Sequence, residues 1–131
     1  MCVFCKIVAG EIPAYKVYED EKVLAFLDIK PVHPGHILVI PKQHVATLEE
    51  VSPTTLQALI LIVKKLGGVL KEQTNYEGYN VCLNNDPVAN QEIPHLHFHI
   101  IPRVSGDGLK GWPQQEYAAG EAEEILNKLK R

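Results

Sequence analysis

Histidines occupy every second position of the apolar run 94-PHLHFHIIPR-103. Successive side chains of a strand point to opposite faces, so His95, His97 and His99 are expected on one face and the apolar residues between them on the other, against a core. Two positions of a strand advance about 6.6 Å and four about 13 Å, whereas zinc binds nitrogen at about 2.0–2.1 Å. The two outer histidines are therefore badly placed to share one ion, and a single metal does not explain all three.

The apolar pattern elsewhere predicts further strands and two helices. Short β-rich runs separated by charged and Pro/Gly-containing turns cover residues 15–20, 22–29, 36–42 and 78–85, and the histidine run adds a strand over 95–101. Short connections between neighbouring strands favour an antiparallel arrangement. The sequence therefore predicts an α+β fold with an antiparallel sheet of about five strands, a long central helix and a C-terminal helix.

The long helix has a clear predicted start. Ser52 is a typical N-cap and Pro53 suits the first helical position. Apolar residues follow at helical spacing as far as Leu70, so one face of the helix is expected to lie on the sheet. Gly67 and Gly68 each cost up to about 1 kcal/mol of helix propensity, which indicates either close packing or a break at that point.

The chain ends in a second predicted helix, which begins at about Tyr117. Acidic residues precede basic ones along it, as suits the helix dipole. Its apolar residues share one stripe, formed by Ala118, Ala122, Ile125, Leu126 and Leu129.

The composition fits one compact domain over residues 1–131, with 46% hydrophobic residues. A net charge of −3 and a pI near 6.0 provide no electrostatic reason to expect a nucleic acid polymer as partner. No apolar run reaches the ~18 residues of a membrane span, and the N-terminus lacks the pattern of a secretory signal. We therefore expect a cytoplasmic protein without a membrane partner.

The cysteines point to a metal site or a redox motif. Three cysteines, at positions 2, 5 and 82, are too few and too unevenly spaced for a secreted disulfide framework. A thioredoxin-like pair follows a strand and opens a helix, but no strand is predicted before Cys2-x-x-Cys5, which argues against redox use. Cys82 falls in an apolar strand and is interpreted as a small core residue.

Two long segments resemble the histidine triad (HIT) family. The run HLHFHII over 95–101 is similar to the family's His-x-His-x-His-x-x signature, in which x is apolar. Residues 4–44, FCKIVAGEIPAYKVYEDEKVLAFLDIKPVHPGHILVIPKQH, resemble the N-terminal half of the family, and residues 83–103 resemble its C-terminal signature region. The likeness spans nearly the whole chain and extends to the zinc-containing bacterial and archaeal members and the HINT branch.

This resemblance implies an enzyme that attacks the α-phosphate of a nucleoside 5′-phosphate derivative and works as a homodimer whose sheets join across a two-fold axis. His97 matches the family nucleophile, a role that neutral imidazole, with an ordinary pKa of about 6.5, can fill if its other nitrogen is held as a donor. His99 matches the phosphate-binding residue and His36 the histidine behind the triad. The other implied site residues are Asn84 and Gln91 near the phosphate and leaving group, Asp28 at the ribose hydroxyls, and Phe4, Ile12, Phe26 and Ile29 around a purine base.

Plainer interpretations of part of this set stay open. The four apolar residues serve equally well as core, and Asp28 before IKP is also a typical turn former. The loop before the triad usually reads Gly-Gln-Ser or Gly-Gln-Thr in the family, whereas here it is Asn90-Gln91-Glu92. After glycine, Asn best tolerates a positive φ. Glu92 stands where the family has a hydroxyl that could donate to the leaving group. Its carboxylate either alters the leaving-group preference or simply points to solvent.

Some HIT proteins begin CxFCKI and bind a structural zinc through that cysteine pair, a histidine after PK and the first histidine of the triad. The matching residues here are Cys2, Cys5, His44 and His95, a set with no open coordination position. This assignment would leave the other two triad histidines for phosphate. Two further functions remain to be compared: a zinc-stabilised nucleotide-binding module without turnover, and a zinc hydrolase that uses the histidines as ligands.

Overall fold

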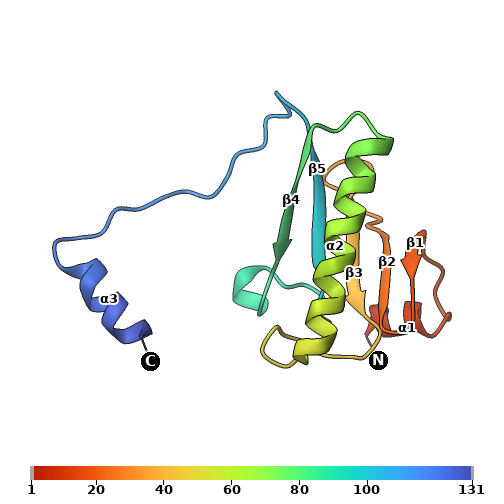
Figure 1. Cartoon of the computed structure of the whole chain (residues 1–131), viewed down its shortest axis with the longest axis horizontal. Coiled ribbons are helices and arrows are strands. Elements are labelled where there is room, and N and C mark those ends of the chain that lie inside the picture. The colour runs from red at the N-terminus through yellow and green to blue at the C-terminus, as the bar shows by residue number, and fades with distance from the viewer. Residues whose placement is uncertain (1, 131) are drawn as a thin grey trace.

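The computed structural model describes residues 2–130, and at its centre is a five-stranded sheet in the order β1-β2-β3-β5-β4 (Figure 1). Each neighbouring pair of strands is antiparallel. The expected α+β fold with an antiparallel sheet is therefore confirmed. The strands are β1 (Lys16–Glu19), β2 (Val23–Leu27), β3 (Ile37–Pro41), β4 (Gly78–Leu83) and β5 (Phe98–Arg103).

Both faces of the sheet are covered, which explains why β2 and β3 are apolar throughout instead of alternating. On one face, Val23 and Ala25 pack with the helix α2 (Pro53–Gln73). On the other face, Leu24 and Phe26 pack with the short helix α1 (Val3–Val8).

Helix α2 begins as the sequence predicts, because the Ser52 hydroxyl accepts a hydrogen bond from the Thr55 N–H at 3.2 Å. Close packing explains Gly67: a Cβ there would lie 2.3 Å from Cζ of Tyr79 on β4. By length and apolar composition α2 could also span a membrane, a property shared by core helices of soluble proteins. Here one of its faces is buried against the sheet through Leu59, Val63, Leu66 and Leu70.

Helix α1 was not predicted from the sequence. Its N-cap is Cys2, whose Sγ accepts a hydrogen bond from the Cys5 N–H at 3.2 Å. Phe4 and Ile7 lie one turn apart on this helix and are both buried against the sheet. The cysteine pair therefore opens a helix, and that helix covers the second face of the sheet.

The strand that carries the histidines begins later than predicted. The N–H of Leu96 donates to the Val45 carbonyl oxygen at 2.7 Å instead of to a neighbouring strand, so β5 starts only at Phe98. The expected alternation of faces is nevertheless confirmed, because Leu96 and Ile100 are buried in the core beneath α2.

Residues 104–130, here called the arm, leave the sheet and end in the helix α3 (Glu121–Leu129), which stands apart at the left of Figure 1. This helix begins later than the predicted Tyr117 because Gly120 has a φ of 79° and the Glu121 N–H closes a turn onto the Ala118 carbonyl oxygen. Within the described chain, no residue of α3 is buried. Its apolar stripe is therefore left uncovered by its own chain.

Candidate active site and metal centre

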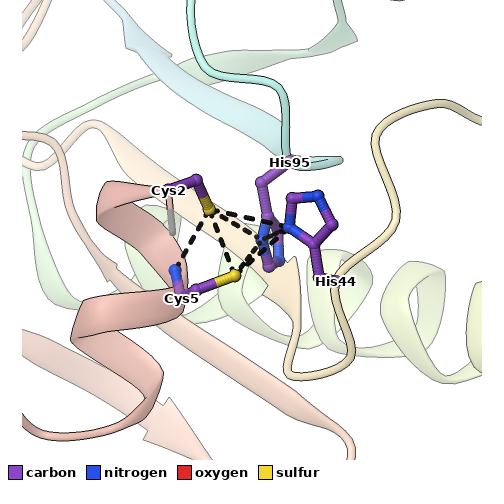
Figure 2. A group of neighbouring side chains, drawn as sticks. All are labelled: Cys2, Cys5, His44 and His95. Atoms are coloured by element: carbon purple, nitrogen blue, oxygen red, sulfur yellow. Dashed lines mark hydrogen bonds between the residues drawn. The ribbon is translucent and has the colours of Figure 1, made fainter.

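Two cysteines and two histidines from separate segments converge at the start of α1 (Figure 2). Cys2 and Cys5 belong to the first turn of that helix, His44 follows β3 and His95 precedes β5. The two Sγ and two Nδ1 atoms are separated from one another by 3.2–3.7 Å. A tetrahedral ion with bond lengths of about 2.0–2.3 Å separates its ligands by about 3.3–3.8 Å, so the four atoms fit around one ion.

The His95 ring is fully buried, and a backbone contact sets its tautomer. Its Nε2–H donates to the Pro41 carbonyl oxygen at 2.8 Å, which leaves the Nδ1 lone pair facing the sulfurs. Desolvation and the adjacent Cys2 raise the pKa of the Cys5 thiol, so a cation is needed to hold two thiolates this close. The cluster could therefore bind a metal, and its four protein ligands leave no position for a substrate.

A pocket of about 490 Å³ lies beside this cluster, a volume typical of small-ligand sites. Part of its lining is apolar: the buried rings of Phe4 and Phe26 meet edge to face at 5.4 Å, with Ile12 nearby and the exposed Ile29 at the rim. The four residues proposed for the base therefore all line the pocket, and two of them are also core. Its polar lining consists of Asp28, Lys30, Asn84, Asn90, Glu92, His97 and His99.

His97 is held in one tautomer at the pocket wall. Its Nδ1 lies 2.7 Å from the carbonyl oxygen of His95, so Nδ1 carries the proton and Nε2 keeps its lone pair. Burial lowers the pKa of His97, which keeps the ring neutral near pH 7. The Phe4 ring packs against it edge to face at 5.2 Å. His97 thus has the properties of a nucleophile or a general base.

A hydrogen-bonded relay sets the orientation of His99. The Val32 N–H donates to Nδ1 of His36 at 3.1 Å, so His36 is protonated at Nε2 and donates to Nδ1 of His99 at 2.9 Å. His99 is then protonated at Nε2, a buried atom with no hydrogen-bond partner among residues 2–130. Burial, followed by repulsion from His97 and His36, lowers the pKa of His99 to about 4. His99 therefore presents a neutral N–H that an anionic oxygen would satisfy.

Asp28 forms the turn that its sequence context suggests and also reaches the pocket. Its Oδ1 accepts from the Lys30 N–H at 2.9 Å, which confirms the turn interpretation. Its Oδ2 lies 3.8 Å from Nε2 of His36, and the side chain lines the pocket. One carboxylate oxygen thus builds the turn, while the other faces the site.

Gln91, like His36, does not line the pocket. It lies in the loop between β4 and β5, after the 3₁₀ turn η1 (Pro87–Ala89). Its amide donates to the carbonyl oxygens of Ala46 at 2.7 Å and Ile93 at 3.1 Å, and its oxygen accepts from the Asp86 N–H at 2.8 Å. Gln91 thus holds the shape of the loop, and any effect on a phosphate would be indirect.

The two loop positions that depart from the usual family pattern both line the pocket. Asn90 has a φ of 71°, a left-handed conformation that Asn tolerates better than most residues other than glycine. Its carbonyl oxygen accepts from Nδ2 of Asn84 at 3.3 Å. Glu92 is exposed at the pocket, so its carboxylate faces both the solvent and an incoming ligand.

Sequence reasoning missed several lining residues and the backbone groups that set the tautomers. Ile7 lies one helical turn after Phe4, and Lys30 lies two positions after Asp28, so simple spacing could have suggested both. Leu38 lines the pocket from the same face of β3 as Ile40. The Val32 amide and the Pro41 and His95 carbonyl groups carry no sequence signal, because nearly every residue has such groups.

The HIT domain family matches residues 9–106, and the chain belongs to this family. An uncharacterized HIT-like protein of Methanocaldococcus jannaschii is 56% identical over 108 residues, covering 82% of this chain and 83% of that protein. An adenosine 5′-monophosphoramidase of Candida albicans is 42% identical over 136 residues, covering 98% of this chain and 89% of that protein. An adenylylsulfatase of Arabidopsis thaliana is 44% identical over 108 residues, covering 82% of this chain and 55% of that protein.

Solved structures agree with the fold. The crystal structure of a HIT family member from Bacillus subtilis matches with a TM-score of 0.89 at 39% identity, covering 98% of this chain and 94% of that one. A Zn-bound histidine triad family protein from Mycobacterium smegmatis matches with a TM-score of 0.80 at 35% identity, covering 97% and 91%. Both matches extend into the arm.

Proposed function

We propose that this protein is a nucleotide hydrolase that cleaves nucleoside 5′-phosphoramidates, dinucleoside polyphosphates or related nucleotidyl derivatives at the α-phosphate, through a nucleotidyl intermediate on His97. The observation that carries this proposal is the tautomer of His97: Nδ1–H is bound to a carbonyl oxygen, and Nε2 keeps its lone pair at a pocket of nucleotide size. Membership of the HIT family, with relatives named adenosine 5′-monophosphoramidase and adenylylsulfatase, supports hydrolysis of nucleotides.

In the first step, Nε2 of His97 attacks the α-phosphorus, an N–P bond forms, and the leaving group departs with the electron pair of its bond to phosphorus. The ring becomes cationic, which strengthens its hydrogen bond to the His95 carbonyl oxygen. The Nε2–H of His99 donates to a phosphate oxygen that gains charge. In the second step water adds to phosphorus, the N–P bond breaks, and the nucleoside monophosphate leaves. The water loses one proton and the leaving group gains one, so the net reaction is hydrolysis.

The nucleoside end of the substrate would occupy the apolar part of the pocket. The rings of Phe4 and Phe26, inclined at 74° to each other, and the side chains of Ile12 and Ile29 offer apolar walls for a purine base. The carboxylate of Asp28 would accept hydrogen bonds from the ribose hydroxyls through the oxygen that the turn does not use. Asn84 would contribute a polar side chain near the phosphate.

We infer that the ion of the cysteine–histidine cluster is a structural zinc. The donor set and the Zn-bound relative from Mycobacterium smegmatis support this assignment. Zinc would stabilise the fold by linking the start of α1, the segment after β3 and the segment before β5. A cytoplasmic location suits the site, because thiols are kept reduced there.

We also propose that the protein works as a homodimer whose sheets join across a two-fold axis. β4 is an edge strand of 6 residues and offers unpaired backbone groups, whereas the other edge, β1, has 4 residues and an irregular register near Lys16. The arm supports a second copy as its partner. A helix of 9 residues such as α3 is too short to be stable alone in water, and its apolar stripe needs a surface to cover it.

Two alternatives share these residues. A nucleotide-binding module without turnover would need the pocket but would not need an unprotonated Nε2 on His97. A zinc hydrolase could use Asp28, His36 and His99, whose ligand atoms lie close together. However, the Nε2–H of His36 donates to Nδ1 of His99 at 2.9 Å, so the lone pair that a metal would need on this nitrogen of His99 is already used.

The test compares wild type and His97→Ala on an adenosine 5′-phosphoramidate, a dinucleoside polyphosphate and adenylyl sulfate. Wild type should release nucleoside monophosphate, and mass spectrometry after an alkaline quench should find one nucleotidyl group on His97. The variant should lose several orders of magnitude in rate while still binding the monophosphate in calorimetry. Activity above about a tenth of wild type in the variant would favour a metal-bound water as nucleophile. Binding without turnover by the wild type would favour the binding module.

A further inference from the structure

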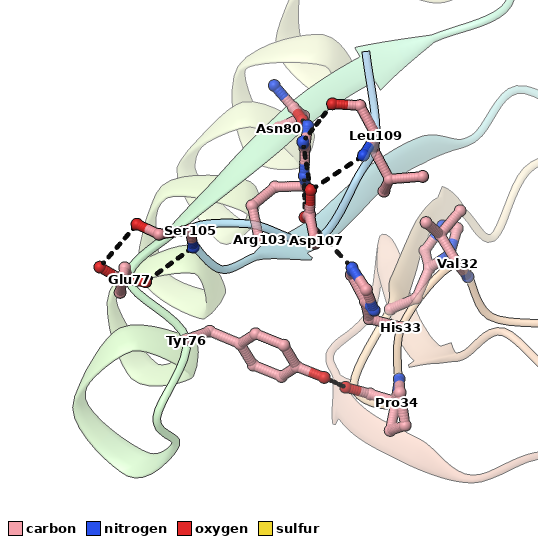
Figure 3. Close-up of polar contacts among 11 residues, drawn as sticks. Val32, His33, Pro34, Tyr76, Glu77, Asn80, Arg103, Ser105, Asp107 and Leu109 are labelled. Carbon is pink, nitrogen blue, oxygen red and sulfur yellow. Dashed lines mark hydrogen bonds and ion pairs between the residues drawn. The ribbon is translucent and has the colours of Figure 1, made fainter.

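A second polar cluster lies outside the pocket, where the arm leaves β5 (Figure 3). At its centre the Asp107 side chain is 4% exposed and accepts hydrogen bonds from Nε and Nη2 of Arg103 at 2.6 and 2.9 Å. Oδ2 of Asp107 also lies 3.2 Å from Nε2 of His33, a residue 74 positions earlier in the chain. The proposed reaction uses none of these three side chains, so the cluster needs a separate explanation.

His33 belongs to the loop that joins β2 to β3, and this loop is held from outside at two points. The His33 ring packs against the Tyr76 ring at 6.0 Å between centroids, and the Tyr76 hydroxyl donates to the Pro34 carbonyl oxygen at 2.7 Å (Figure 3). The contact with Asp107 is the second point. The loop is therefore tied to the segment after α2 and to the base of the arm.

The same loop carries the donor on which the histidine relay depends. Val32, the neighbour of His33, donates its N–H to Nδ1 of His36 at 3.1 Å, and the His33 carbonyl oxygen accepts from the His36 N–H at 3.1 Å. The bond from Val32 places the proton of His36 on Nε2, which faces His99, and the backbone bond holds the loop beside it. If the loop shifts, the Val32 donor is lost and His36 is free to adopt either tautomer.

We propose that Asp107 and His33 are a positioning pair for the phosphate-binding histidines: Asp107 holds His33, and the loop around His33 then holds the Val32 amide that sets the tautomer of His36. Through His36, the pair would control the N–H that His99 presents to a phosphate. The expected effect on catalysis rests on the proposed function, whereas the expected effect on the His36 tautomer does not.

The charge of the cluster suits this role. The hydrogen bonds from Arg103 hold the pKa of the Asp107 carboxyl well below its usual range. The carboxylate is therefore a permanent acceptor for the Nε2–H of His33. Arg103 also donates to Oδ1 of Asn80 at 2.7 Å, which anchors the pair to β4.

The experiment compares full-length His33→Ala, His33→Gln and Asp107→Ala with wild type. His33→Ala and Asp107→Ala should lower kcat by about tenfold with little change in KM, because a misplaced phosphate donor is felt mainly in the transition state. His33→Gln keeps a side-chain donor for Asp107 and should recover most of the lost kcat. Glu77→Ala is the matched control. Glu77 holds the same arm base through Ser105, at 2.8 and 3.2 Å, so its loss should leave kcat unchanged if the link through His33 is what matters.

Imidazole ¹⁵N spectra provide a second readout that does not depend on activity. Wild type and His33→Gln should show His36 protonated at Nε2, while His33→Ala and Asp107→Ala should show a mixture of tautomers. Wild-type kcat together with unchanged His36 signals in His33→Ala would overturn the pairing, and so would an equal loss of kcat in Glu77→Ala. If no nucleotide is turned over by the wild type but the tautomers change as expected, the proposed function fails and the positioning pair stands.

Discussion

The backbone carbonyl oxygen of His95 lies 2.7 Å from Nδ1 of His97, while the His95 ring belongs to the cysteine–histidine cluster. One residue therefore contacts both sites: its side chain faces the metal cluster, and its carbonyl group sets the proton position on the proposed nucleophile. The two sites remain chemically separate, because Nδ1 of His95 and Nε2 of His97 serve different partners. A change in the metal cluster should consequently affect stability first and catalysis only when it displaces this carbonyl group.

Loss of a metal ligand should destabilise the protein before it slows the reaction. Protein purified without chelator should contain one zinc per chain, and Cys5→Ser should lower both the metal content and the melting temperature more than the rate per folded molecule. Elemental analysis, thermal melting and rate measurements test this. Cys82→Ser, at a half-buried position in β4 outside the cluster, is the control and should keep its zinc. Wild-type protein without zinc would contradict the assignment.

Substitutions at Asp28 should separate its turn from its proposed ribose contact. Asp28→Asn keeps an oxygen for the Lys30 N–H but loses the charge, whereas Asp28→Ala loses both. Wild type should prefer a ribonucleoside 5′-phosphoramidate over its 2′,3′-dideoxy analogue by about 100-fold or more in kcat/KM, because the analogue lacks two charge-assisted hydrogen bonds that each contribute about 1.5–3 kcal/mol. Both variants should lose most of this preference, and only Asp28→Ala should also lower the melting temperature. If wild type hydrolysed the ribonucleoside compound and its dideoxy analogue at equal rates, Asp28 would have only its role in the turn.

Mild acid should destabilise the fold because several buried histidines are neutral in it. Burial lowers the pKa of His36 and His97, and lowers that of His99 to about 4. In the unfolded chain each returns to about 6.5, so the unfolded state binds more protons and the free energy of unfolding should decrease as the pH falls from about 6.5 toward 4. Urea unfolding at several pH values measures this decrease. His99→Asn keeps the metal cluster and removes one titrating ring, so its free energy of unfolding should decrease less over this pH range. Identical pH dependences in the variant and wild type would contradict a contribution from the buried His99 ring.

The two glycines of α2 should respond oppositely to alanine. A Cβ at Gly67 would lie 2.3 Å from Cζ of Tyr79, whereas a Cβ at Gly68 would meet nothing within 4 Å. Gly67→Ala should therefore lower the free energy of unfolding by about 1–3 kcal/mol through overpacking. Gly68→Ala should raise it by up to about 1 kcal/mol through helix propensity. Denaturant titrations measure the free energy of unfolding of each variant. If both substitutions raised it, Tyr79 would have to move aside without cost.

The apolar stripe of α3 should be required for the proposed homodimer. Light scattering on the full chain should give the mass of two copies, and the double variant Ile125→Lys with Leu129→Lys should shift the mass toward one copy, because both side chains are uncovered in the single chain. Asn127→Lys, which adds charge beside this stripe, is the control and should remain dimeric. A monomeric wild type at micromolar concentration would contradict the dimer, and a dimeric double variant would remove the arm from the interface.

Patterns in the sequence correctly predicted the elements whose residues interact locally or whose apolar residues repeat at a regular period. The cap at Ser52 and the helical spacing up to Leu70 predicted α2, because helix formation depends on neighbours within one or two turns. The alternation around His97 correctly separated a polar face from the core. The resemblance to HIT proteins then named residues most of which line one pocket; of the others, His36 contacts His99 from behind and Gln91 is used within the loop.

The remaining features depend on contacts between distant residues, which a local pattern does not record. The start of β5 is set by a hydrogen bond from Leu96 to Val45, and the link between His33 and Asp107 joins residues 74 positions apart. The proton positions on the histidines depend on backbone groups of Val32 and His95. Nearly every residue carries such groups, so they become selective only when the folded chain brings one of them within about 3 Å of a particular ring. Residue type and periodicity therefore predict which face a histidine occupies, whereas the tertiary contacts set which of its nitrogens can react.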